Sequence, residues 1–404
     1  MENHPHAPIA PAIYWMLPGP RAFIDSISHG VLHGRAVLVE VQGRGVIGFW
    51  YAFEQALLAT HTDSEQPLRL TVEDGSHIES DVGHHLGLTT ISPSQLAQHM
   101  GTRHRKIVLT PRGARAAEKC RTFLLAFAEA SQSKAEAGCV TLVVVRAEAD
   151  PVWPSAGLTK VSFGGALSAE EMTAYVGMRM IGRRGPGSTA LTQHLVAEFA
   201  GYDASFAEEL MRLSEHELLG LPQSLPLVAH RMTTSDTVWR EARLETGTVA
   251  LVNGDVKAHV LHEWHLSSHE GPMREAARRS IASRYWRAAL RALMPWLEER
   301  RHHIIKILEP QLERYLLPTG GMRIRYSARG TRSTEVPISE LECNDIISMK
   351  VDRDNPFIVS ASRHITAVDV CFKVTKVRNE LAHLRCPEPA AIMELVQSMD
   401  QLLY

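Results

Sequence analysis

The stretch "VLVEVQGRGVIGFWYAF", from Val37 to Phe53, contains the pattern that decides the fold of the first half of the chain. Its first six residues are a short apolar run of the kind that forms a buried strand. Gly43 and Gly48 then keep the two-glycine spacing of a loop that cradles phosphate with its backbone N–H groups. Lys and then Ser or Thr should follow Gly48, but Phe49 and Trp50 occupy those positions.

The same stretch resembles the phosphate loop of P-loop ATPases of the AAA+ or STAND branch, with its catalytic residues missing. Backbone groups of Gly43, Gly45 and Gly48 remain candidates for binding a nucleotide phosphate. The missing lysine and hydroxyl would supply most of the electrostatic stabilisation of phosphoryl transfer. Glu148, after the apolar run 140–145, is a poorly placed substitute for a magnesium-binding carboxylate. We therefore predict a scaffold or sensor domain; an active ATPase with a non-standard loop and a plain strand-to-helix turn are the alternatives.

Short apolar strands alternate with helical patterns through residues 1–150. The expected strands are Val37–Gln42, Leu68–Glu73, Lys106–Thr110 and Val140–Val145. An amphipathic helix pattern, Ala114 to Ser131, lies between the last two strands. This alternation predicts an α/β domain with a parallel sheet covered on both faces, a fold that binds nucleotides at the carboxyl ends of its strands.

The remaining chain is expected to form a mainly helical middle region, residues 151–270, and an all-α domain, residues 271–404. Ser168 to Glu171 is a capping-box start. Two β-like runs, Thr248–Asn253 and Lys257–Leu261, predict a small hairpin. From Arg274 to Leu316 the pattern predicts one long helix or two, interrupted at Pro295 and Pro310. A glycine-rich basic loop should follow, and then helices over 338–349, 365–384 and 387–403.

The overall charge of −2 includes a basic block. From Arg274 to Arg332, 14 Lys or Arg stand against 5 Asp or Glu, a net of +9, so the rest of the chain sums to −11. A basic block in an otherwise acidic protein predicts contact with a polyanion, most commonly nucleic acid. An arginine-rich helix face that pairs with acidic groups of the same chain fits the pattern equally well. The residues that we expect to contact RNA are Arg278, Arg279, Arg284, Arg323 and Arg325.

Near the carboxyl terminus, "RNELAH" (Arg378 to His383) combines side chains suited to metal-free cleavage of RNA. His383 supplies an imidazole, a group that can take or give the proton of a ribose 2′-hydroxyl or a leaving oxygen near neutral pH. The guanidinium of Arg378 stays charged and can hold the phosphate as negative charge develops. Helix geometry separates the two side chains by about 140°, so they are not stacked neighbours. They can still line one end of a helix packed against a symmetric second chain, where two copies would bring two arginines and two histidines into one cleft.

This motif closely resembles the R-x4-6-H signature of the HEPN superfamily, with Asn379 at the polar position found after the arginine in its active ribonucleases. The segment "YWRAALRALMPWLEERR" also resembles the early long helix of such domains, and "ISELECNDIISM" resembles the segment between that helix and the motif helix. The resemblance covers residues 274–404 and implies a four-helix bundle that dimerises, with Arg378, Asn379 and His383 as a composite active site for RNA. Many members are instead non-catalytic RNA-binding or dimerisation modules, and such residues can also simply cap a helix.

The five cysteines are scattered without a CxxC pair, so we expect neither a disulfide framework nor a structural zinc site. Cys371, His383 and Cys386 are close in sequence, but the missing fourth ligand favours buried thiols on a helix. We therefore expect no metal and no cofactor. No apolar run approaches the length of a membrane span, and the first residues lack the layout of a signal peptide. The cytoplasm is the expected location.

The leading hypothesis is a two-part protein of a prokaryotic defence or toxin system. A catalytically inactive P-loop-like domain would regulate a metal-independent HEPN-type endoribonuclease that acts as a homodimer, and other proteins of the same system are further candidate partners. One rival is a non-enzymatic adaptor, which predicts no RNA cleavage and no dependence on His383. The other is an ATP-binding STAND- or AAA-like regulator, in which nucleotide binding depends on Gly43 and Gly48.

Overall fold

A computed structural model describes most of the chain, and its internal contacts define two compact units. The described residues are 9–41, 48–60, 65–100, 103–132, 139–147, 157–181, 188–235, 249–252, 255–326 and 333–403. Unit 1 comprises Met1–Arg179, Tyr202–Glu208 and Val249–Lys257, and unit 2 comprises Met180–Gly201, Glu209–Thr248 and Ala258–Tyr404. The predicted division at residues 150 and 270 stays a prediction.

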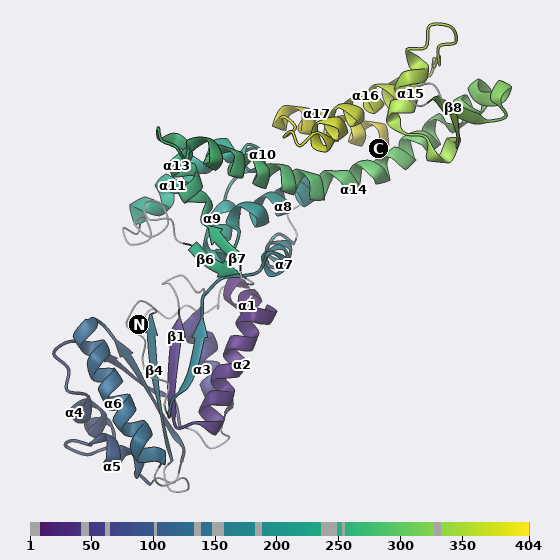
Figure 1. The fold of residues 1–404 in the computed structure, drawn as a ribbon. Coiled ribbons are helices and arrows are strands. Elements are labelled where there is room, and N and C mark those ends of the chain that lie inside the picture. The colour runs from purple at the N-terminus through teal and green to yellow at the C-terminus, as the bar shows by residue number, and fades with distance from the viewer. Residues whose placement is uncertain are drawn as a thin grey trace. The chain divides into compact units, whose positions relative to one another are not determined.

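A five-stranded sheet forms the centre of unit 1 (Figure 1). Its strands are β1 (Ala36–Val41), β2 (Leu68–Val72), β3 (Arg105–Pro111), β4 (Val140–Ala147) and β5 (Thr159–Phe163). They lie in the order β2-β3-β4-β1-β5, and every adjacent pair is parallel. The predicted parallel sheet is therefore confirmed. The sequence did not indicate β5, because "TKVSF" is short and half polar.

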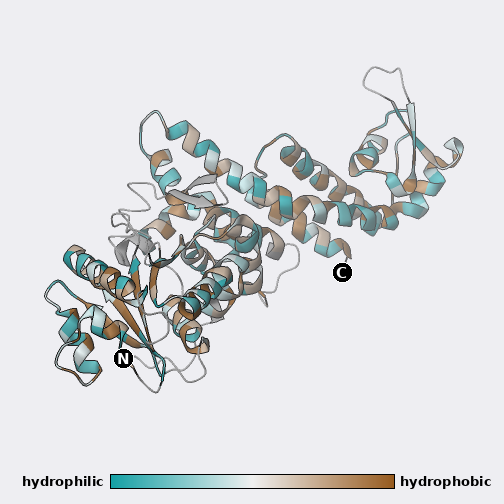
Figure 2. Ribbon diagram, turned by 60° about the horizontal axis from the view of Figure 1, so that its bottom comes forward, coloured by the Kyte–Doolittle hydropathy of each residue, from teal (hydrophilic) through white to brown (hydrophobic). Residues whose placement is uncertain are grey.

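Helices cover both faces of this sheet (Figure 1). On one face, α2 (Pro18–His33) packs on α3 (Phe49–Ala59), β1 and β5. On the other, α6 (Ala114–Gln132) packs on β1, β3 and β4 and contacts the short helices α4 (Ile78–His85) and α5 (Pro93–Ala97). All six residues of β1 are buried. Burial on both faces explains why the central strands appear as continuous apolar runs, which are brown in Figure 2.

The connections between strands change direction beside β1. After β1 the chain crosses to β2 at the edge of the sheet, returns through β3 to β4, and then passes β1 to reach β5. The connection after β1 and the connection after β4 thus run in opposite directions from adjacent strands. Such a topological switch point is where ligands bind in open α/β sheets.

Smaller elements of unit 1 agree with the local sequence signals. Helix α7 (Ala169–Arg179) begins with the expected capping box, in which the Ser168 N–H donates to Glu171 Oε2 at 2.9 Å and the Glu171 N–H donates to Ser168 Oγ at 3.1 Å. Strands β6 (Val249–Val252) and β7 (Asp255–Ala258) form a two-stranded sheet where the hairpin was expected. The second strand is displaced towards the amino terminus because helix α13 begins at Val260.

Unit 2 contains a helix of 43 residues, α14 (Arg274–Leu316). It packs on α8 (Ser188–Ala200), α11 (Leu221–Ser235) and α13 (Val260–Ser268). Apolar and polar residues alternate along it at helical spacing, as Figure 2 shows in brown and teal. Pro295 and Pro310 both lie inside this helix, so one element rather than two occupies the stretch.

Three more helices follow in the chain. They are α15 (Cys343–Lys350), α16 (Ser362–Ala382) and α17 (Pro389–Leu403), and α16 contacts α14, α15 and α17. Helix α16 packs along α14, with its end held at Trp286. The expected glycine-rich loop was wrong in part, because β8 (Met322–Tyr326) and β9 (Ser333–Pro337) pair there in antiparallel fashion. Within the described ranges, every helix is too short or too polar to span a bilayer. An α/β unit and a mainly helical remainder are established, whereas the HEPN assignment of the bundle stays a prediction.

Candidate functional site

Aromatic packing fills the start of α3, where a phosphate loop would place its lysine. The ring of Phe49 lies 6.2 Å from Trp15 and 6.3 Å from Phe23, measured between centroids. Phe23 in turn stacks on Phe163 at the end of β5, with centroids 4.8 Å apart. Phe49 is buried by these contacts. Position 49 therefore holds α2 and the preceding helix α1 (Ile9–Met16) against α3 and β5, and it supplies no cation for phosphate.

Gly48 is required where the chain enters α3. Its φ of +67° lies in the left-handed region, and a Cβ atom added there would lie 2.5 Å from the Cβ of Pro11. Gly48 has no side chain to cap the first N–H groups of α3, and a bound anion is one way to satisfy such groups. Gly43 and Gly45 lie outside the described residues, as does Glu148.

A buried ion pair joins β1 and β4 one residue before both strands end. Glu40 and Arg146 are register partners, and Arg146 Nε donates to Glu40 Oε1 at 3.1 Å. On β5, Ser162 Oγ donates to Glu40 Oε2 at 2.7 Å, and Lys160 Nζ lies 2.9 Å from the same oxygen. Burial acts to raise the pKa of Glu40, but the hydrogen bonds from Arg146, Lys160 and Ser162 lower it overall. This charged network fixes the three strands that border the switch point.

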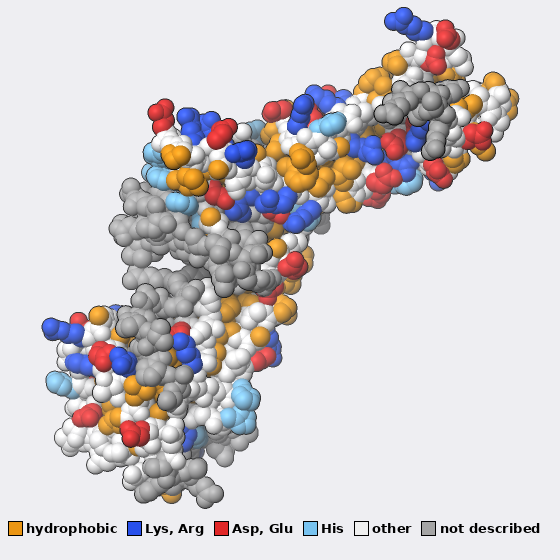
Figure 3. Space-filling view, viewed as in Figure 1, with side chains coloured by type: hydrophobic (Ala, Val, Ile, Leu, Met, Phe, Trp, Pro, Cys, Tyr) orange, Lys and Arg blue, Asp and Glu red, His pale blue; other side chains and the backbone are white. Residues whose placement is uncertain are grey.

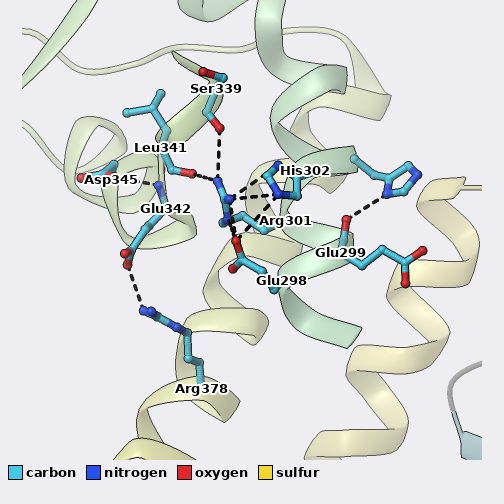
Figure 4. Close-up of polar contacts among 10 residues, drawn as sticks. Glu298, Glu299, Arg301, His302, Ser339, Leu341, Glu342, Asp345 and Arg378 are labelled. Carbon is cyan, nitrogen blue, oxygen red and sulfur yellow. Dashed lines mark hydrogen bonds and ion pairs between the residues drawn. The ribbon is translucent and has the colours of Figure 1, made fainter. Parts of the chain in front are cut away.

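Arg378 leaves the last turns of α16 towards the start of α15 (Figure 4). Its Nη1 donates to Glu342 Oε2 at 2.9 Å. The two side chains are 43% and 39% exposed, so this ion pair adds at most about 1 kcal/mol to stability. A phosphate that reached Arg378 would therefore displace a weakly held carboxylate.

The same arginine lines a groove of about 170 Å³ between α14, α15 and α16. Glu298 and Arg301 enter this groove from α14, and Arg301 Nη2 donates to Glu298 Oε1 at 2.6 Å. That hydrogen bond lowers the pKa of Glu298 against the effect of burial, and the charges of Arg301 and Arg378 add to the lowering. Two arginines and two carboxylates therefore share the groove, so the charge of Arg378 is balanced within one chain (Figure 4).

His383 follows α16 as its C-cap residue and is exposed. Its backbone N–H donates to the carbonyl of Asn379 at 3.0 Å, and the Asn379 side chain is also exposed. Leu384 then ends the helix in a left-handed conformation with φ of 58°. Across the described part of the chain, no hydrogen bond or ion pair joins His383 to Arg378. The three predicted catalytic residues thus lie on one helix end, and a single chain does not bring the imidazole and the guanidinium together.

The predicted RNA-binding arginines of α14 differ in their availability. Arg278 and Arg279 are exposed. Arg284 is held inside unit 2, because its Nε lies 2.8 Å from Glu263 Oε2 and its Nη1 donates to the carbonyl of Glu198 at 3.0 Å. Its guanidinium is therefore used for internal packing, and only the first two have side chains open to a polyanion.

The other two predicted arginines are on β8. Arg325 Nε donates to Asp345 Oδ1 at 2.7 Å, which ties the hairpin to the start of α15. Arg323 lies on the same strand and is half-buried. Arg287 and Arg291 of α14 both pair with Glu198 of α8. Acidic and basic side chains are accordingly intermixed on the face of the molecule in Figure 3, and part of the basic block is neutralised within unit 2.

The thiols predicted as alternative metal ligands have different surroundings. Cys371 is buried on α16, and a hydrogen bond with Cys343, followed by burial, raises its pKa. Cys386 is exposed. Among the residues that the structure describes, no group of three or more His, Cys, Asp or Glu side chains is arranged to hold a metal ion.

Sequence analysis missed Glu298, Arg301 and Glu342 as neighbours of the motif. A helix-start signal was available, since Glu342 precedes Asp345 by three residues and the Glu342 N–H donates to Asp345 Oδ2 at 2.8 Å. That signal places Glu342 at the start of a helix. Only the packing of α15 against α16 shows that the start faces Arg378.

Comparison with known proteins does not assign this chain to a family. No family model matches the chain, and no curated protein matches it. A solved structure of a STAND (signal transduction ATPase with numerous domains) protein with a tetratricopeptide repeat sensor, from Pyrococcus horikoshii, is similar at 11% identity and a TM-score of 0.26. The similarity covers 93% of this chain and 58% of that one, so the chain spans less than two thirds of its length. A TM-score this low carries no argument about fold or function.

Proposed function

We propose that this chain is a regulatory protein in which unit 1 binds a nucleotide of the ATP class without hydrolysing it, and that the bound state controls the helical unit. The strand order supports this proposal, because its switch point lies between β1 and β4 and Gly48 is the N-cap residue of the next helix after β1. Phosphate can bind at such an edge through backbone N–H groups and a helix N-terminus. Phe49 and Trp50 supply neither the lysine nor the magnesium-binding hydroxyl that phosphoryl transfer uses.

Calorimetric titration with ATP and magnesium, beside a phosphate-release assay, tests this proposal. We expect ATP to bind and no phosphate to be released above background. Gly48→Ala should abolish binding, since the new Cβ meets Pro11 and the backbone is left-handed. Gly87→Ala is a matched control, because Gly87 also has a positive φ (+76°) but has open space around it. Failure of the wild-type chain to bind ATP contradicts the proposal.

A second activity, metal-independent cleavage of RNA, is favoured by the end of α16. Arg378 is partly exposed on a groove, and Asn379 and His383 are exposed beside it, so a strand of RNA and a second copy of the chain can reach all three. His383 would move the proton of the 2′-hydroxyl, and Arg378 would exchange Glu342 for the scissile phosphate. We propose that unit 1 regulates this cleavage activity. The active form would be a HEPN-type homodimer with a role in defence or as a toxin.

Cleavage of RNA in the presence of EDTA tests the second activity. We expect Arg378→Ala and His383→Ala each to lower the rate by about 100-fold or more. His303→Ala, which changes an exposed histidine on α14, should have no effect. If each site combines groups from two chains, mixing the two inactive variants should restore roughly a quarter of the activity, because half of the random dimers regain one of two sites. Equal cleavage by wild type and both variants contradicts this mechanism.

A further inference from the structure

A second cavity, of about 330 Å³, lies in unit 2 beside the end of α16. Residues of α11, α13 and α14 line it together with the segment that follows α16. Trp264 and Tyr285 contribute aromatic rings, and Ile281 contributes an apolar wall. This volume is at the lower end of the range of small-ligand pockets, about 300–1,000 Å³.

The polar groups of this cavity divide into those already bonded and those available. The Tyr285 hydroxyl donates to the carbonyl of Leu219 at 2.9 Å, and Cys386 Sγ donates to the carbonyl of Ala282 at 3.3 Å. Three other lining side chains have no hydrogen bond or ion pair within the described residues. They are Gln223, Arg278 and Glu388.

An amide, a guanidinium and a carboxylate around aromatic and apolar walls suit a nucleobase. A base can stack on an indole or phenol ring, while its edge forms hydrogen bonds with the donors of Gln223 and Arg278 and with the acceptor of Glu388. The carboxylate of Glu388 would repel a phosphate placed inside the cavity. Arg278 and Arg279 are exposed on α14, where they can contact the phosphates that remain outside.

The cavity lies close to the Arg378–His383 motif. Cys386 follows His383 by three residues, so their Cα atoms are at most about 11 Å apart. Trp286 Nε1 donates to the carbonyl of Leu381 at 2.8 Å, which holds the end of α16 against the same turn of α14 as Tyr285. A strand whose phosphate lies at His383 can therefore place a neighbouring base in the cavity.

We propose that this cavity binds a base of single-stranded RNA next to the bond that is cut. The role in cleavage rests on the proposed ribonuclease activity, whereas binding of the base does not. Binding is therefore measured first with the full-length His383→Ala chain, which leaves RNA intact, by fluorescence anisotropy of a short labelled single-stranded RNA. A second RNA with one abasic position identifies the contribution of the base.

Filling the cavity should weaken binding. Ala282 lines the cavity and is exposed, so the larger side chain of Ala282→Trp fills the cavity without entering the core. Ser283→Trp is the control, because it adds the same side chain at the next, exposed position of α14. We expect Ala282→Trp and Trp264→Ala to weaken binding by about 5- to 100-fold, the range for loss of a stacked base. Ser283→Trp should bind like the parent chain.

The His383→Ala chain should bind the abasic RNA as weakly as the chain with the filled cavity binds intact RNA. Adding Ala282→Trp should not weaken binding of the abasic RNA further. Unchanged binding of intact RNA by Ala282→Trp and Trp264→Ala overturns the proposal, even if the wild-type chain cleaves RNA. So does the absence of any RNA binding. Binding that depends on the cavity in a wild-type chain that cuts no RNA keeps this proposal and refutes only the ribonuclease.

Discussion

Lys106 of β3 is a buried cation in the core of unit 1. Its Nζ donates to the carbonyl of Leu57 on α3, to which Thr60 Oγ1 also donates at 2.8 Å. Burial lowers the pKa of Lys106 to about 8. The lysine is thus held in a core that disfavours its charged form at neutral pH.

Replacing Lys106 with Met should stabilise the protein at pH 7 by an amount on the order of 1 kcal/mol, because the desolvated charge is removed while the side-chain length is kept. Since the folded pKa lies below the ordinary value of 10.5, the unfolded chain binds more protons between pH 8 and 10.5. The advantage of the variant should therefore shrink across that range. Urea unfolding at pH 7, 8.5 and 10 measures the difference in free energy of unfolding between the variant and the wild type. Lys376→Met, at an exposed site on α16, is the control. A difference in free energy that stays constant from pH 7 to pH 10 would show that burial of the Lys106 charge is not its cause.

Glu40 and Arg146 should behave as one unit in a double-mutant cycle. Glu40→Met removes the carboxylate that Arg146 bonds, and Arg146→Met leaves the buried Glu40 with Lys160 and Ser162. We expect each single variant to lose up to about 3–5 kcal/mol and the double variant to lose much less. The lowered pKa of Glu40 means that its contribution is present above the ordinary value of 4.5 and is lost as pH falls below it. Denaturant unfolding of the four proteins gives the coupling energy. Additive single effects would show that the pair is not coupled.

Single residues also mark the limit of what could be predicted. The sequence shows Glu40 and Arg146 only as polar interruptions near the ends of two apolar runs. Their pairing depends on β1 lying next to β4 in a fixed register, and neither the strand order nor the register is encoded in local periodicity. The same holds for Glu342, whose contact with Arg378 spans two helices.

At the scale of elements, prediction was good where a segment is buried on both faces or on one regular stripe. The strands β1 to β4, the helix α6 and the helices after Cys343 follow from such patterns. Prediction was poor in segments where glycine or proline determined the expected structure. Glycines around Met322–Tyr326 suggested a loop, although the alternation of apolar residues with Arg323 and Arg325 is a strand pattern. The prolines of α14 left one helix or two open, and the structure has one, which packs against several neighbours.

Asp345 connects two of these elements, and its loss should loosen the hairpin. It accepts hydrogen bonds from Arg325 of β8 and from the N–H of Glu342. Asp345→Asn keeps the shape but weakens both charged hydrogen bonds, so we expect hydrogen exchange of the β8 amides to rise by about tenfold. Exchange mass spectrometry measures this, and Glu340→Gln, an exposed neighbour, should leave it unchanged. Protection of β8 that does not change would show that the sheet needs no support from α15.

At the scale of the whole molecule, the folded charge distribution decides how strongly a polyanion is attracted. The sequence gives the block from Arg274 to Arg332 a net charge of +9. The structure pairs Arg287 and Arg291 with Glu198 and places Arg284 on Glu263. These carboxylates lie outside the block in sequence, so the sum over a sequence window overstates the charge that a ligand meets. Lys306 and Arg314 are also exposed, on later turns of α14, so Arg278 and Arg279 are the exposed arginines of the block that lie beside the cavity.

A strand of RNA bound at the cavity should therefore contact few of these cations, and its affinity should depend only weakly on salt. Each phosphate contact contributes about −0.7 to the slope of log K against log salt, so full use of the block would give about −6, whereas two or three contacts give about −2. We expect the shallow slope when the affinity of the His383→Ala chain is measured from 50 to 300 mM salt. Glu198→Gln should steepen it by releasing Arg287 and Arg291, while Glu340→Gln, away from these pairs, should not. A wild-type slope near −6 would mean that RNA displaces the internal carboxylates and that the basic block acts as a continuous surface.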